Sequence, residues 1–161
     1  GSFTTLFWKT IAIDGNRYIN VYTSQLVGDD AFTVYAHPRR ADLIECLSTN
    51  KRFQDLSAFN KGIYSLAVEG DDVVMSDLRM GLSPNYVFRF AIAEAAADGM
   101  RSLDLPTRLP VIRGVDGDWG WVFASIAGNA VPRPAEVAAL VTLDDLGPRK
   151  MSLAMTQCAA G

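Results

Sequence analysis

The stretch from Val73 to Glu94 constrains the fold more than any other, because it predicts two neighbouring strands. Apolar and polar residues alternate from Val73 to Arg79 and again from Tyr86 to Ala93, which is the two-residue period of a half-buried strand. Between these runs, residues 80–85 contain glycine, serine, proline and asparagine, the usual turn formers. The sequence therefore predicts an antiparallel hairpin with a long, irregular turn, and the aromatic face of its second strand belongs to the core.

The same hairpin carries the charged residues that are the strongest site candidates. Asp77 and Arg79 are two positions apart and so share one face of the first strand. Arg89 reaches that face from the second strand if the register sets it opposite Asp77, and an Arg-Asp-Arg cluster would follow. The preferred interpretation is an ion-pair network that fixes the register, in which exposed members contribute under about 1 kcal/mol each.

The alternative is a site for a small anionic ligand. A carboxylate would hold a guanidinium in place, and the planar arginine fork suits bidentate contact with carboxylate or phosphate. His37 and Tyr64 are further candidates for such a ligand-binding site, together with Asp77, Arg79 and Arg89. A tyrosine in a strand is nevertheless a core residue by default.

Turn and helix signals complete the predicted fold. Asp14-Gly15-Asn16 separates two alternating runs and predicts an opening hairpin over residues 6–25. Two apolar stripes at helical spacing, broken near residues 48–50, predict a helical segment from Arg39 to Phe59. Ile63 to Glu69 is a further strand, which a Gly-Asp-Asp turn joins to the next one. We therefore predict a single α+β domain, an antiparallel sheet of about five or six strands with the helical segment packed on one face.

The C-terminal part is expected to add two helices. Trp119 to Ala127 predicts a short helix that presents Trp119, Phe123 and Ile126. These three side chains and Trp121 are expected to cover an edge or face of the sheet. Pro134 to Leu146 predicts a second helix, and the tail that follows has no regular apolar stripe. We accordingly place a soluble α+β domain over residues 1–130, and a C-terminal helix with a weakly ordered tail over residues 131–161.

Composition excludes several classes of function. A chain of 161 residues is long enough to bury a sizeable core, and no apolar window approaches the roughly 20 residues of a transmembrane helix. The net charge is −3 without a basic stripe, which argues against nucleic-acid binding. The two cysteines, Cys46 and Cys158, predict unpaired thiols rather than a disulfide framework or a zinc site.

The sequence also lacks most of the residues and motifs that catalysis or metal binding requires. His37 is the only histidine, so no site that needs two imidazoles can form, and we expect no metal or cofactor in this part of the protein. The sequence contains no G-x-S-x-G elbow and no glycine-rich phosphate loop. Catalytic residues therefore stay unassigned. The alternative is a self-sufficient hydrolase domain that uses Asp77, Arg79 and His37.

Several segments together resemble one known family. SDLRMG followed by YVFRFAIAE, with FWKTIAIDGNRYINVYTS, FNKGIYSLAVEGDDVV and DWGWVFASIAG, is similar to the soluble C-terminal portion of bacterial inner-membrane-bound proteins described as predicted metal-dependent hydrolases. The resemblance runs from about Leu6 to Gly128. It implies a membrane-embedded N-terminal part of the same chain, with histidine motifs that would hold a divalent metal. Because this sequence begins with Gly1 and not with methionine, we expect the native N-terminus to lie upstream.

The resemblance and the residue chemistry together predict an accessory role. We expect a non-catalytic module at the bacterial inner membrane, itself soluble, that binds a ligand, a protein partner or the membrane-embedded part of its own chain. Two unpaired thiols favour the cytoplasmic side. A catalytic domain would gather Asp77, Arg79 and His37 in a pocket, whereas an accessory one would bury or pair them. A protein–protein interaction domain, the third alternative, would expose an apolar patch of several hundred Å².

Overall fold

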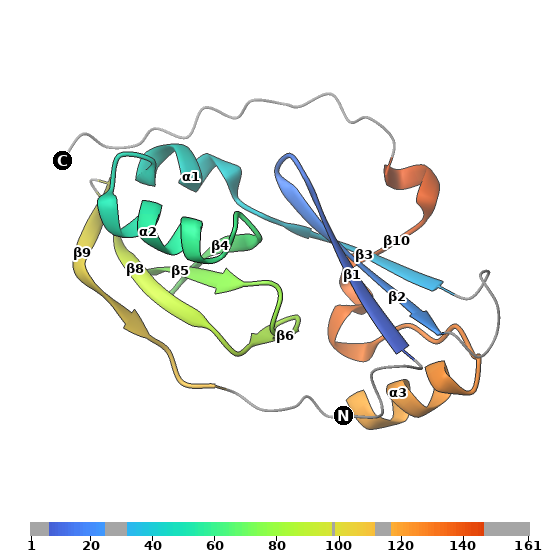
Figure 1. Cartoon of the computed structure of the whole chain (residues 1–161). Helices are drawn as coiled ribbons and strands as arrows, with labels where there is room; N and C mark the ends of the chain where they lie inside the picture. The colour runs from blue at the N-terminus through green and yellow to red at the C-terminus, as the bar shows by residue number, and fades with distance from the viewer. Residues whose placement is uncertain (1–6, 25–31, 98, 112–116, 147–161) are drawn as a thin grey trace. The chain divides into compact units, whose positions relative to one another are not determined.

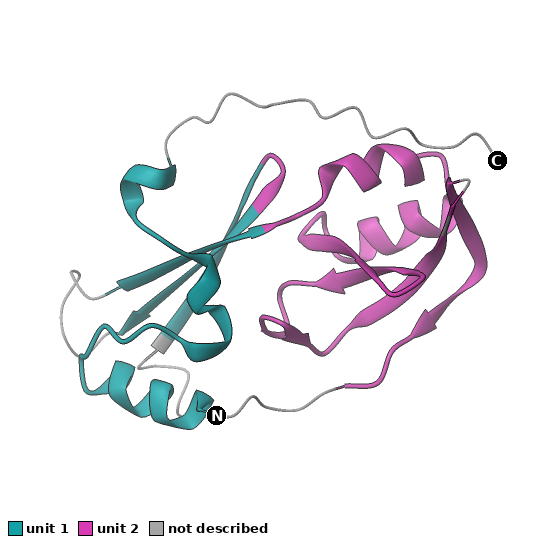
Figure 2. Cartoon of the chain, turned by 180° about the vertical axis from the view of Figure 1, so that it is seen from behind, with its two compact units in different colours: residues 1–14, 18–37, 113–150 teal, residues 15–17, 38–112, 151–161 magenta. Residues whose placement is uncertain are grey.

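The computed structural model describes residues 7–24, 32–97, 99–111 and 117–146, and the chain divides into two compact units (Figure 2). Unit 1 comprises residues 1–14, 18–37 and 113–150, and unit 2 comprises residues 15–17, 38–112 and 151–161. Helices and antiparallel strands make up the described residues, which confirms the α+β class. The strands form two four-stranded sheets and a two-stranded ribbon, in place of one sheet of five or six strands.

Unit 1 is built on a sheet in the order β1-β2-β3-β10 (Figure 1). Its strands are β1 (Phe7–Asp14), β2 (Arg17–Ser24), β3 (Phe32–Pro38) and β10 (Leu140–Val141). β1 and β2 form the predicted opening hairpin, and Gly15 in its turn has a φ of 57°, which glycine adopts without strain. Alternate residues on one face of β2 are all buried: Tyr18, Asn20, Tyr22 and Ser24. This face of the sheet therefore carries polar groups into the interior of the unit.

The one α-helix in the described part of unit 1, α3 (Asp118–Ile126), turns a single tryptophan inward. Trp121 is buried, meets the ring of Tyr22 edge-on with 5.0 Å between centroids, and donates from Nε1 to Val131 O at 3.1 Å. The expectation that Trp119 and Phe123 cover the sheet is wrong, because their side chains are 75% and 61% exposed. On a helix, residues two positions from an inward side chain lie on the opposite face, so burying Trp121 exposes both neighbours.

The helix predicted from Pro134 to Leu146 is replaced by three short elements. These are the 3₁₀ helix η2 (Pro134–Ala139), the strand β10, and a second 3₁₀ helix, η3 (Leu143–Leu146). β10 pairs with β3 in antiparallel register, and the opposed residues are Leu140 with Tyr35 and Val141 with Val34. Pairing with a strand that is distant in the sequence overrides the local helical pattern. Residues 131–146 thus belong to unit 1 with the N-terminal strands, and the predicted tail lies outside the described residues.

Unit 2 contains two helices that pack on one face of a sheet in the order β4-β5-β8-β9 (Figure 1). Its main elements are α1 (Ala41–Leu47), α2 (Lys51–Phe59), β4 (Tyr64–Glu69), β5 (Asp72–Asp77), β8 (Arg89–Ala96) and β9 (Gly99–Arg108). The core joins apolar side chains of both layers, including Leu43, Leu47, Phe53, Leu66, Met75 and Ile92. The predicted helical segment is confirmed, and its break occurs where the Asn50 side chain caps α2 by accepting from Phe53 N at 2.9 Å.

The long turn of the central hairpin forms a ribbon of its own, β6 (Gly81–Leu82) and β7 (Asn85–Tyr86). Gly81 has a φ of 118°, and a Cβ at this position would lie 2.8 Å from Asn85 O and 2.9 Å from Tyr86 Cα. Both the backbone conformation and the close approach of the second strand therefore require glycine here.

Two further observations concern the environment in which the protein works. Cys46 in α1 is disulfide-bonded, so the expectation of an unpaired thiol at this position is wrong, and Cys158 lies outside the described residues. Disulfides persist mainly in oxidising compartments, so the cysteines no longer favour the cytoplasmic side of a membrane. No helix within the described ranges is long and apolar enough to cross a membrane.

Candidate functional site

The structure brings Asp77 and Arg79 together at the end of β5, in unit 2. Arg79 Nε lies 2.9 Å from Asp77 Oδ1, and Arg79 Nη2 lies 2.5 Å from Asp77 Oδ2. The backbone N–H of Arg79 also donates to Asp77 Oδ1 at 2.9 Å. The side-chain hydrogen bond to Asp77 raises the pKa of Arg79. Since Asp77 is only 1% exposed, the pair stabilises the turn after β5 and leaves little carboxylate surface for a ligand.

Arg89 does not join this pair. The register of β5 and β8 sets Arg89 opposite Ser76, and the backbone N–H of Asp77 donates to Phe88 O at 2.9 Å. A shift of one residue in a strand moves a side chain to the other face of the sheet. The Arg89 guanidinium accordingly forms an ion pair with Glu69, and the predicted Arg-Asp-Arg cluster does not form.

Tyr64 is a core residue of unit 2. Its side chain is buried in the hydrophobic cluster and meets the Phe53 ring edge-on, with 5.7 Å between centroids. The Arg39 guanidinium carbon lies over the Tyr64 ring at 4.9 Å from the centroid, and Arg39 Nε donates to Tyr64 O at 3.0 Å. The tyrosine is therefore enclosed by its own unit.

His37 belongs to unit 1, whereas the other four predicted site residues belong to unit 2. Its Nε2 lies 2.6 Å from Glu136 Oε1, and its ring stacks on Tyr18 with 4.9 Å between centroids. The His37 side chain is 16% exposed, while that of Glu136 has no exposed surface. The histidine thus links the protein surface to a buried carboxylate that the sequence analysis did not single out.

Glu136, in η2, is the centre of the most highly connected polar cluster in the described residues. Oε1 accepts from Asn20 Nδ2 at 2.9 Å in addition to His37, and Oε2 accepts from Tyr22 OH at 2.7 Å and from Arg133 Nη1 at 2.9 Å. Burial alone would raise the pKa of Glu136, but the hydrogen bonds from these four side chains outweigh it and lower the pKa to about 2. Glu136 is therefore an anion at neutral pH, held by donors from β2, β3 and the residue before η2.

Arg133 connects this carboxylate to a second one. Its Nε and Nη2 donate to the two carboxylate oxygens of Asp118 at 2.8 and 2.9 Å, and its guanidinium lies over the Trp121 ring at 5.6 Å. Its backbone N–H donates to Tyr35 OH at 2.7 Å. Burial opposes the charge, yet the hydrogen bonds to Asp118 and Glu136 raise the pKa of Arg133. The bidentate contact joins α3 to η2 with fixed geometry.

Lys9 on β1 is the remaining cation of this cluster. Burial lowers the pKa of Lys9 to about 8, with Glu136 acting in the opposite direction and Arg133 in the same direction. The amine is therefore partly deprotonated at slightly alkaline pH. The cluster now contains an ammonium, a guanidinium, an imidazole and two carboxylates, which come from β1, β3, α3 and η2 with the residue before it.

The hydrogen bonds within this cluster limit which of its atoms can react with or bind another molecule. Both oxygens of Glu136 already accept two hydrogen bonds each. Because an ionised carboxylate only accepts, His37 Nε2 carries the donated proton, and the lone pair of the neutral ring lies on Nδ1. Nδ1 makes no hydrogen bond to another described residue, so its lone pair is not used by the internal bonds of the cluster. The described residues contain no group of three or more His, Cys, Asp or Glu placed to hold a metal ion.

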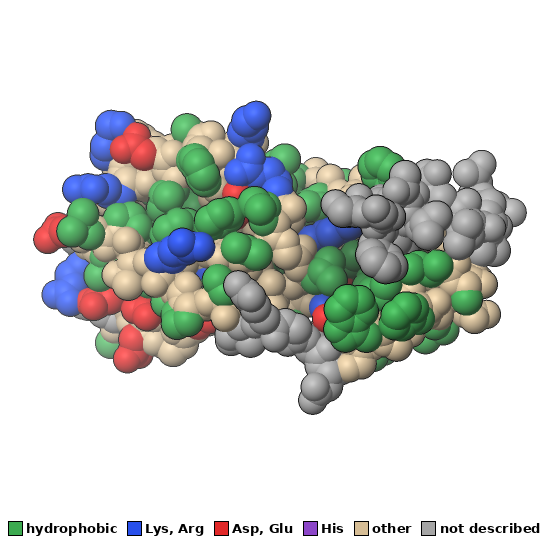
Figure 3. Space-filling view, turned by 60° about the horizontal axis from the view of Figure 1, so that its bottom comes forward, with side chains coloured by type: hydrophobic (Ala, Val, Ile, Leu, Met, Phe, Trp, Pro, Cys, Tyr) green, Lys and Arg blue, Asp and Glu red, His purple; other side chains and the backbone are tan. Residues whose placement is uncertain are grey.

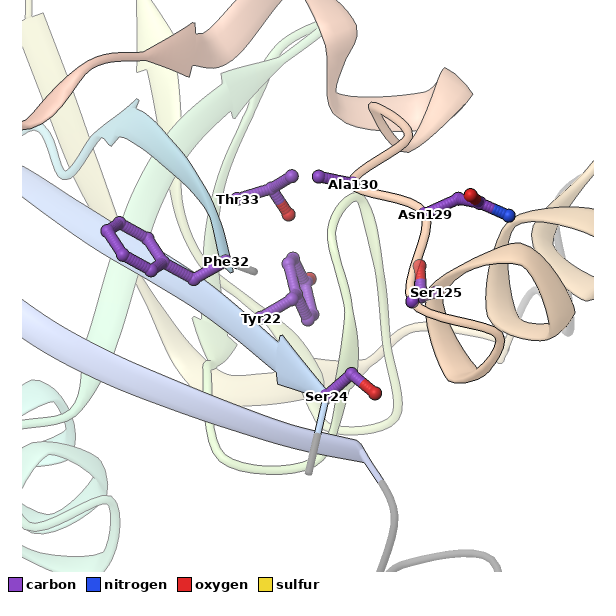
Figure 4. Close-up of a pocket in the computed structure, with 8 residues that line it drawn as sticks. Tyr22, Ser24, Phe32, Thr33, Ser125, Asn129 and Ala130 are labelled. Carbon is purple, nitrogen blue, oxygen red and sulfur yellow. The ribbon is translucent and has the colours of Figure 1, made fainter. Parts of the chain in front are cut away.

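A small pocket adjoins the cluster at the Tyr22 end of β2 (Figure 4). Its lining residues include Ser24, Thr33, Ser125 and Asn129, which are polar, together with Tyr22 and Phe32. The volume is about 10 Å³, close to what a single water molecule requires. The pocket can therefore solvate the hydroxyl groups around it and is too small for an organic substrate.

Comparison with protein-family models, curated proteins and solved structures finds no match to this chain. The site must therefore be interpreted from its own geometry. One signal in the sequence could have located it: Asn20 occupies a position of β2 that alternation assigns to the core. A buried amide needs hydrogen-bonding partners, so its presence indicates a polar network. The sequence does not indicate that the partner is Glu136.

Proposed function

We propose that this chain is a non-catalytic binding module, the soluble C-terminal portion of an inner-membrane-bound protein that resembles predicted metal-dependent hydrolases. The observation that supports the proposal is that the buried carboxylates are hydrogen-bonded to side chains of their own unit. Glu136 accepts four hydrogen bonds from its own unit, and Asp77 is held in a bidentate contact by Arg79. An accessory domain buries or pairs such groups, whereas a catalytic domain directs them at a substrate.

The pKa of Glu136 supports the same conclusion. A general base works best with a pKa near the operating pH, and Glu136, at about 2, is a poor proton acceptor at neutral pH. The carboxylate instead orients His37 and offsets the charge of Arg133. We propose that the divalent metal and the catalytic histidines belong to the membrane-embedded part of the same chain, which would also be a partner of this module.

Exposed apolar side chains support the binding role. Figure 3 shows hydrophobic side chains gathered at the surface of the molecule. In unit 1 the large exposed ones include Trp119, Phe123, Val137, Leu140 and Leu143. The rings of Trp119 and Phe123 adjoin, with 6.2 Å between centroids, and apolar surface that is contiguous over several hundred Å² would mark an interaction site.

The competing function is a self-sufficient hydrolase that uses His37, and one observation favours keeping it in the test. The Glu136 carboxylate orients His37, and the other ring nitrogen makes no hydrogen bond to a described residue, which is the arrangement of a histidine general base. The same arrangement occurs in purely structural networks. The two functions differ in whether a change at His37 alters a reaction rate or only stability.

The experiment is a hydrolysis assay of the purified chain. The substrates are p-nitrophenyl acetate, p-nitrophenyl phosphate and bis(p-nitrophenyl) phosphate, each with Mg²⁺, Mn²⁺ or Zn²⁺. We expect rates equal to those of His37→Ala and of the exposed control variant Thr10→Ala in the same buffers. Turnover that His37→Ala abolishes and Thr10→Ala retains, with both variants folded by circular dichroism, would overturn the proposal.

A further inference from the structure

We draw no further inference here: the strongest candidate, the exposed aromatic face that Trp119 and Phe123 form on α3, carries nothing because the described residues do not show what covers it.

Discussion

A carboxylate without exposed surface is stable in a folded protein only when other groups replace the water it has lost. Glu136 meets this requirement through two donors on each oxygen, of which one is the charged Arg133. Arg133 in turn is balanced by Asp118. Such a network fixes the position of every residue in it, because each lost bond leaves a buried group without its partner. The stability of unit 1 therefore depends strongly on the single residues of this network.

The first residue to test is Glu136. Glu136→Gln should destabilise the protein by about 3–5 kcal/mol, the usual effect of removing one member of a buried charge pair. The amide cannot accept at both ends and leaves Arg133 without one of its two counter-charges. Urea unfolding measures the loss. Asp144→Asn is the control, since Asp144 is exposed in the same unit and its change should stay within about 0.5 kcal/mol.

The lowered pKa of Glu136 gives this prediction a pH dependence. The pKa of Glu136 is about 2 in the folded protein, whereas its ordinary value is 4.5. Between pH 2 and pH 4.5 the unfolded chain therefore binds the proton more readily than the folded protein does. The stabilisation is complete above about pH 4.5 and is lost as the pH falls towards 2. Glu136→Gln should therefore lose less stability than the wild type over this range. If the free energy of unfolding fell by the same amount with decreasing pH in both proteins, the result would contradict the hydrogen-bond network around Glu136.

At the scale of elements, single residues in turns and helix caps determine the local backbone geometry. The ribbon β6–β7 joins β5 to β8, and its geometry depends on Gly81, which the backbone of Asn85 and Tyr86 approaches closely. A side chain at this position meets backbone atoms that cannot rotate away. The central hairpin of unit 2 therefore has one position where the identity of the residue is fixed by space as well as by φ.

Two glycine substitutions should act with opposite signs. Gly81→Ala should destabilise the protein by about 1–3 kcal/mol, because it combines a strained φ with the backbone contact. Gly120→Ala in α3 meets nothing within 4 Å and should stabilise the helix by roughly 0.5–1 kcal/mol. Thermal melts of both variants measure the difference. Equal changes of melting temperature in the same direction would mean that the turn around Gly81 does not have the backbone geometry described above.

Elements with local signals were predicted from the sequence, and elements that depend on distant partners were not. The turn at Gly15, the helix break near residues 48–50 and the shared face of Asp77 and Arg79 involve residues only a few positions apart. β10 forms because Leu140 and Val141 pair with β3, and no local pattern announces that partner. The alternation of apolar and polar residues likewise indicates that a segment is a strand, but it does not indicate which sheet the strand joins. The structure therefore has two four-stranded sheets where the sequence predicted one sheet.

At the scale of the whole molecule, the candidate site was beyond the reach of local patterns. Glu136 lies 116 residues from Asn20 and 114 from Tyr22, so their proximity is a property of the finished fold. His37 was identified because histidine chemistry is recognisable in a sequence, yet its partner was not. Unit 1 is discontinuous, with β1, β2 and β3 in the N-terminal part of the chain and α3, η2 and β10 in the C-terminal part. Unit 2 is nearly continuous, and this difference leads to the last prediction.

Residues 38–111 should fold without the rest of the chain. Every member of the hydrophobic core cluster of unit 2, from Leu43 to Ala93, lies within this fragment, as does the partly buried Met100 that packs against it. The main hydrogen bonds lost are those of Asn16, whose O and Oδ1 accept from Arg39 N at 2.7 Å and Ala41 N at 2.6 Å. With Cys46 kept reduced, the fragment should show a cooperative melt and dispersed amide protons by NMR.

Two other fragments make that prediction discriminating. Residues 38–98 lack β9 and Met100, so one side of β8 loses its ladder and the core loses cover, and we expect no cooperative melt. Residues 1–37 lack Glu136, Arg133 and Trp121, which leaves the buried polar face of β2 without partners and should prevent folding. A cooperative melt from residues 38–98 would show that β9 is an appendage. Folding of residues 1–37 would show that the fold does not require the Glu136 cluster, and the cluster would then need a functional explanation instead of a structural one.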